Sequence, residues 1–138
     1  ANRGGNNNSV GIESCITKDT DLYYTWQKTA KLVARLLDQN NLTLDDVKQH
    51  HYFSGKNCPQ TMRMNGMWSH FMELVAFEKA MLEFQKEGYQ IELICTDERV
   101  SKNGRIINTE SLDEISYVIR TTKDNIVEEL LVNMQINK

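Results

Sequence analysis

A short stretch of the chain concentrates side chains that bind metals. Residues 50 to 59 read HHYFSGKNCP and end on the single proline of the sequence. Zinc prefers imidazole nitrogen, thiolate sulfur and carboxylate oxygen, and a hydrolytic zinc site leaves a position open for water beside three protein ligands. The flexible sequence Ser-Gly-Lys lies between His50 and Cys58, so these two side chains could converge on one ion. Cys58 would bind as a thiolate, favoured by the metal and by the positive charge of Lys56.

These residue types alone leave two interpretations open. One histidine and one cysteine at this spacing also suit a polar surface loop with a buried thiol. Glu13 strengthens the metal interpretation only if its strand lies beside the loop, and is otherwise a solvated glutamate. We expect His51 to point away from His50 in an extended segment, and His70 to lie in a helix at the edge of a groove or of the core.

Composition limits the classes of function. The 138 residues are 40% hydrophobic and 25% charged, with a net charge of -3, which suits a soluble globular protein. The charges are interspersed and no run approaches the roughly 20 apolar residues of a membrane span, so we expect neither nucleic acid nor membrane as a partner. The first residues lack the pattern of a secretory signal, and we expect an export signal either to lie upstream of them or not to exist.

Periodicity predicts the elements that position the candidate ligands. Residues 9 to 16 alternate, so we expect a strand with Glu13 on the face opposite its apolar side chains. Apolar residues then recur at spacings of three and four. They predict a helix of about five turns that is capped by Thr20 or Asp21 and ends near residues 38 to 41.

The remaining elements follow from the same rules. Thr43 would cap a short helical turn, from which an extended segment leads into the histidines. A second long helix after Pro59 should end at Gly88. Beyond Gly88, short alternating runs, one of them at residues 104 to 108, predict a small antiparallel sheet. We therefore divide the chain into residues 1–86 and 87–138, and expect the second part to lean on the first, because about 50 residues bury little core of their own.

Three stretches of the first part also carry a family resemblance. SVGIESC, TWQKTAKLVARLL and VKQHHYFSGKNCPQTMR closely resemble the zinc-dependent N-acetylmuramoyl-L-alanine amidases of the phage-lysin and peptidoglycan-recognition superfamily, over residues 1 to 85. The most specific element is a histidine followed after seven residues by Cys-Pro, with a lysine two positions before the cysteine. The resemblance implies that His50 and Cys58 bind Zn²⁺, that Lys56 stabilises the developing oxyanion and that Glu13 handles the attacking water or its proton.

The resemblance also implies a fold and an incomplete site. It predicts an α/β fold, a mixed sheet flanked by helices with its N-terminal strands missing, followed by a small all-β antiparallel module. The first zinc-binding histidine of the family lies on an early strand, and residues 1–49 contain no histidine. We therefore expect this chain to be the C-terminal part of an amidase catalytic domain, inactive alone and completed by an N-terminal segment or chain. The tail loosely resembles bacterial immunoglobulin-like modules.

The function implied by this resemblance is peptidoglycan hydrolysis. The amide between N-acetylmuramic acid and the L-alanine of the stem peptide would be cut by zinc-activated water, outside the cytoplasmic membrane or in the cell wall, by a bacterial or phage-encoded protein. Two alternatives stay open. One is a non-catalytic peptidoglycan-binding protein, and the other is a structural spacer with a degenerate first half.

Overall fold

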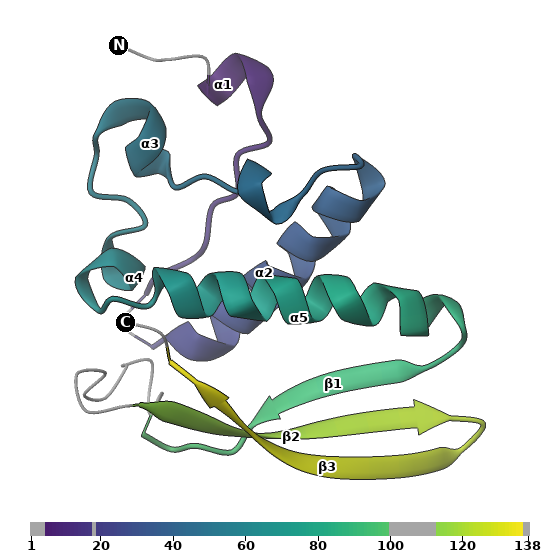
Figure 1. Cartoon of the computed structure of the whole chain (residues 1–138). Coiled ribbons are helices and arrows are strands. Elements are labelled where there is room, and N and C mark those ends of the chain that lie inside the picture. Colours follow the sequence, from purple (N-terminus) through teal and green to yellow (C-terminus); the bar gives the residue numbers. More distant parts are fainter. Residues whose placement is uncertain (1–4, 18, 100–112, 137–138) are drawn as a thin grey trace.

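The computed structural model describes residues 5–17, 19–99 and 113–136, which form a layer of helices over a three-stranded sheet (Figure 1). In chain order the elements are α1 (Gly5–Asn8), α2 (Leu22–Gln39), the 3₁₀ turn η1 (Leu44–Asp46), α3 (His50–Ser54), α4 (Gln60–Met64), α5 (Trp68–Lys86), β1 (Gln90–Cys95), β2 (Glu114–Lys123) and β3 (Ile126–Gln135). Helices α2 and α5 are the long ones, and α5 runs directly above the sheet.

Helix α2 forms where the apolar periodicity predicts it. Asp21 is the N-cap, and its carboxylate accepts a hydrogen bond of 2.9 Å from the backbone N–H of Tyr24, which satisfies a donor left free at the helix start. The helix ends at Gln39, within the predicted range. One face of α2 is buried, and the largest side chains on it are those of Tyr23 and Trp26.

Helix α5 supplies the opposite side of the core. It ends at Lys86. Gly88, two residues later, has φ of 92°, the left-handed conformation expected of a glycine after a helix. The core contains side chains from α2, α4, α5 and the sheet, and from residues next to them: Leu22, Tyr23, Trp26, Ala30, Val33, Ala34, Leu37, Met62, Met67, Phe71, Leu74, Val75, Ile115, Tyr117 and Ile136. None of the helices in the described part of the chain combines the length and apolar content that a bilayer crossing requires.

The three strands form an antiparallel sheet in the order β1-β2-β3, as predicted. Tyr117 of β2 lies opposite Cys95 of β1 and Val132 of β3. Asp124 and Asn125 connect β2 to β3 with φ of 51° and 64°, the two positive values that a type I′ hairpin turn needs. The predicted fold class, an α/β fold with a small antiparallel β module, is confirmed. The run at residues 104–108 lies outside the described residues.

Two predicted local conformations are wrong. Residues 9–16 are extended but belong to no strand, because no described strand lies beside them to complete a hydrogen-bond ladder. The segment is held instead to α2, where the hydroxyls of Ser14 and Thr29 are 3.1 Å apart. The segment that carries His50 is helix α3 rather than extended chain, and Gly55 ends this helix with φ of 73°.

The proposed division after residue 86 stays a prediction. Ile115 and Tyr117 of β2 are fully buried in the same cluster as Phe71 and Leu74 of α5. The β-rich part thus leans on the helices, since its buried face has no other cover among the described residues.

The shared core generates a test of packing. Leu74 is 1% exposed in α5, so Leu74→Ala should lower the free energy of unfolding by about 2–5 kcal/mol through lost burial and the cavity left behind. Leu32→Ala is the matched control, because Leu32 is 47% exposed and should lose about 1 kcal/mol or less. Denaturant unfolding of both variants checks this, and equal losses would contradict the assigned core.

Candidate functional site

The loop at residues 50–58 closes on itself through His51. The backbone N–H of His51 donates to the carbonyl of Cys58 at 3.0 Å, and Nδ1 of the His51 ring lies 3.0 Å from the carbonyl of Lys56. Gly55 donates back to the His51 carbonyl at 2.8 Å. His51 therefore organises the loop with its backbone and ring, and brings the two ends of the stretch together.

His50 and Cys58 line one hollow of about 750 Å³. Its walls include Val10, Ile12 and Ser14, the face of α2 that carries Thr29 and Val33, and most of the residues between Asp46 and Phe53. His50 is exposed and Cys58 is half-buried, so both can be reached from solvent. The structure thus brings together the two residues predicted to bind zinc.

Glu13 and Lys56 lie elsewhere. Both side chains are exposed, and neither is among the described residues that line the hollow around His50. From the same segment Val10, Ile12 and Ser14 line the hollow, whereas Glu13 does not. The four candidate residues therefore form one pair and two separate side chains.

His50 and Cys58 carry the side-chain types that zinc prefers. Imidazole and thiolate suit zinc, but within residues 5–17, 19–99 and 113–136 no three His, Cys, Asp or Glu side chains are grouped to hold a metal. Asp46 also lines the hollow, yet its carboxylate accepts hydrogen bonds from the Thr43 N–H at 2.8 Å and the Thr43 hydroxyl at 3.1 Å, which lower the pKa of Asp46. The described residues around the hollow thus offer two donors of the types that zinc prefers, fewer than the three protein ligands of a hydrolytic zinc site.

The wall of the hollow exposes apolar surface. Val10 is 67% exposed and Leu42 is 43% exposed, although both line the hollow. Contiguous exposed apolar surface around a cavity is typical of a place that binds a ligand or another polypeptide.

A second cluster of titratable side chains is buried, and the sequence did not reveal it. The hydroxyl of Tyr23 in α2 is 2.7 Å from Nε2 of His70 in α5, and the hydroxyl of Tyr117 in β2 is 3.1 Å from the same nitrogen. The two tyrosine hydroxyls are also hydrogen-bonded to each other. His70 is fully buried, so it is a core residue rather than the groove residue that was one of the two expectations.

Burial changes the ionisation of this cluster. Desolvation raises the pKa of both Tyr23 and Tyr117, so both stay neutral hydroxyls. Desolvation also lowers the pKa of His70, and the carboxylate of Glu73, whose Oε2 is 3.5 Å from Nδ1, opposes this only in part. A neutral imidazole that links three elements is thus the favoured state.

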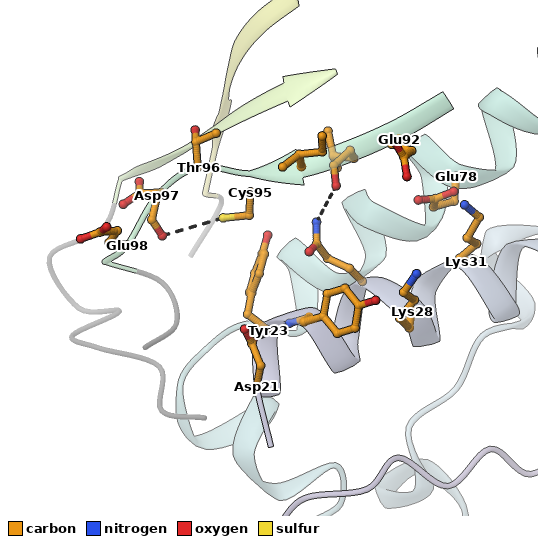
Figure 2. Close-up of a pocket in the computed structure, with 14 residues that line it drawn as sticks. Asp21, Tyr23, Lys28, Lys31, Glu78, Glu92, Cys95, Thr96, Asp97 and Glu98 are labelled. Carbon is orange, nitrogen blue, oxygen red and sulfur yellow. Dashed lines mark hydrogen bonds between the residues drawn. The ribbon is translucent and has the colours of Figure 1, made fainter. Parts of the chain in front are cut away.

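A second hollow, of about 520 Å³, lies between α2 and β1 (Figure 2). Tyr23 and Cys95 lie in its wall, and the rest is rich in charge. Burial raises the pKa of the Cys95 thiol, so this cysteine is not an activated nucleophile.

Comparison with known proteins finds relatives for about half of the chain. It is 34% identical over 71 residues to the N-acetylmuramoyl-L-alanine amidase CwlH of Bacillus subtilis, 36% over 61 residues to the amidase XlyA and 36% over 69 residues to the amidase CwlA of the same organism. These alignments cover 51%, 44% and 49% of this chain. No family model and no solved structure matches the chain.

The chain spans only a minor part of these relatives. The alignments cover 28% of CwlH, 20% of XlyA and 25% of CwlA. The chain is therefore similar to N-acetylmuramoyl-L-alanine amidases over about half its own length.

The buried histidine generates a test of pH dependence. The unfolded chain binds a proton on His70 more readily than the folded chain does, so the free energy of unfolding should fall as the pH drops through the ordinary histidine pKa of about 6.5. His70→Gln should flatten the profile between neutral pH and the lowered pKa. The matched change His51→Gln, at an exposed ring, should leave a profile parallel to that of the parent. Denaturant unfolding at a series of pH values measures this, and a parent-like slope in His70→Gln would contradict the buried neutral imidazole.

Proposed function

We propose that this chain is part of a peptidoglycan hydrolase that cleaves the amide between N-acetylmuramic acid and the L-alanine of the stem peptide. The observation that carries the proposal is its similarity to four N-acetylmuramoyl-L-alanine amidases at 33% to 36% identity. The convergence of His50 and Cys58 on one hollow supports it independently, since zinc favours these two ligand types. Peptidoglycan is then the partner, and the site of action is the cell wall.

In this proposal His50 and Cys58 are two ligands of a catalytic Zn²⁺. The third ligand comes from an N-terminal segment or a separate chain that covers the hollow. The exposed Val10 and Leu42 support such a cover, because burying apolar surface favours association. Zinc bound there would polarise the scissile carbonyl and make the attacking water more acidic.

The roles of the other two candidates follow from their chemistry. Glu13 takes a proton from the attacking water, whose oxygen bonds to the lactyl carbonyl carbon, and passes that proton to the departing L-alanine nitrogen as the C–N bond breaks. Lys56 donates a hydrogen bond to the oxyanion that forms on the carbonyl oxygen. Both side chains are exposed in this chain, so the covering segment and the substrate must bring them to the reacting atoms and exclude water.

Metal binding can be tested without catalysis by using Co²⁺ in place of zinc. We expect a thiolate-to-cobalt charge-transfer absorption that is lost in Cys58→Ser and kept in the matched Cys15→Ser, which removes an exposed cysteine outside the hollow. Loss of a residue that contacts a metal only indirectly weakens metal binding by about 10–100-fold, so His50→Ala should weaken it by at least that much. His51→Ala should weaken it less. An unchanged spectrum in Cys58→Ser would exclude Cys58 as a ligand.

Catalysis is tested on purified cell walls with zinc-loaded protein, alone and together with the N-terminal part of a relative such as CwlH supplied as a separate chain. New amino-terminal alanine is the readout. Where activity appears, Glu13→Gln should lower the rate by about 10²–10⁴-fold, as expected for loss of a general base, while the matched Glu128→Gln on β3 should not.

Two results would count against catalysis by this site. Equal rates for Glu13→Gln and the parent would exclude Glu13 as the base. Wall binding with no released alanine, in preparations that hold the metal, would favour the non-catalytic peptidoglycan-binding alternative.

A further inference from the structure

Strand β1 has one edge that no described strand covers. The sheet order places β1 at the border, with β2 on its other side. The N–H of Thr96 donates to the Ser116 carbonyl at 3.1 Å, so in this antiparallel register the residues at even positions bond to β2. The N–H and C=O groups of Ile91, Leu93 and Cys95 therefore point away from the sheet.

The uncovered edge faces α2 across the hollow of about 520 Å³. Gln27 of α2 reaches over and donates from Nε2 to the Leu93 carbonyl at 3.2 Å, which confirms the direction of these peptide groups (Figure 2). This side-chain amide satisfies only one of the outward-pointing backbone acceptors of β1, the Leu93 carbonyl. The hollow is within the roughly 300–1,000 Å³ of typical ligand pockets, so among the described residues this edge is an open groove.

One end of the groove is lined by carboxylates. Glu98 and Asp97 lie at its end beside the C-terminus of β1, together with Asp21 at the start of α2 (Figure 2). Asp97 is bound by Arg99 at 2.6 Å, whereas Glu98 is exposed.

Lysine side chains line the other end of the groove. Lys28 and Lys31 project from α2 there, near Glu78 and Glu92 (Figure 2). Over the whole groove carboxylates outnumber ammonium groups, and they are concentrated at the end next to Glu98. A ligand with a positive charge at that end is therefore favoured.

We propose that this groove binds an extended peptide, which adds to β1 as a fourth, antiparallel strand with its positively charged N-terminal end beside Glu98. Addition of a strand to a free sheet edge supplies main-chain hydrogen bonds, and the flanking helix supplies selectivity. An antiparallel peptide places its N-terminus at the C-terminal end of β1, where the carboxylates lie. The proposal does not depend on amidase activity, because the groove shares no residue with the hollow around His50.

A second copy of this chain fits the groove less well. Its exposed edge strand β3 carries Glu128 and Glu129 and no cationic side chain. Pairing of β3 with β1 would bring these carboxylates beside the acidic groove, and like charges across an interface disfavour association.

The test is an NMR titration of the whole chain with a peptide of about six residues, a length typical of a strand. The probe is Lys-Thr-Val-Thr-Val-Ser amide with a free N-terminus. Binding should shift the amide signals of Ile91, Leu93 and Cys95 and slow their hydrogen exchange. N-methylation of one alternate set of peptide nitrogens should abolish binding, and N-methylation of the other set should preserve it, because only one set faces β1.

The charge argument has its own matched pair of variants. Glu98→Lys should weaken binding of the probe by about fivefold at low salt, with a smaller effect at high salt, because an exposed charge is reversed. Glu128→Lys makes the same change on β3 and should leave the affinity unchanged.

Several results would overturn the proposal. They are absence of binding at millimolar peptide, equal binding of both N-methylated sets, or shifts that map to the hollow around His50. Amides of Ile91, Leu93 and Cys95 that are already protected from exchange in the free chain would also overturn it, since the edge would then be occupied by the chain itself or by a second copy.

Discussion

The packing of α2 against α5 and β2 is the contact on which the rest of the structure depends. Its centre is the hydrogen-bonded group of Tyr23, His70 and Tyr117, one residue from each element. Hydroxyls taken out of water are costly unless they are paired, so helices and sheet must meet at a rotation that joins all three side chains. Apolar packing holds the elements together, while the hydrogen bonds among Tyr23, His70 and Tyr117 determine their relative orientation.

That arrangement makes α2 the wall of two hollows of different character. The side of the helix with Thr29, Val33 and Leu36 lines an apolar hollow that contains His50 and Cys58. The side with Gln27 and Lys28 lines a charged groove along β1. Because helical residues three or four apart share a face, a single helix presents both surfaces without conflict. The proposed metal and covering polypeptide concern the first surface, and the proposed extended peptide concerns the second.

Local signals were sufficient for the elements whose ends are capped and whose apolar spacing is regular. Asp21 marks the start of α2, and Gly88 follows the end of α5. They were insufficient for residues 9–16, because a strand exists only beside a partner strand and alternation in one segment does not supply one. They also failed for His50, where a single helical turn ending at Gly55 replaced the expected extended chain.

The sequence by itself determined the chemistry available to this protein. The spacing of His50, Lys56 and Cys58 allowed either a zinc loop or a polar surface loop, and the family resemblance favoured the zinc loop. The tertiary structure alone decided that two of these residues line a hollow that Glu13 does not line, and that His70 is sealed between tyrosines 47 positions away on either side. The reason is physical: residue type and spacing along the chain define reactivity, whereas burial and distance between remote residues arise only when helices and strands pack.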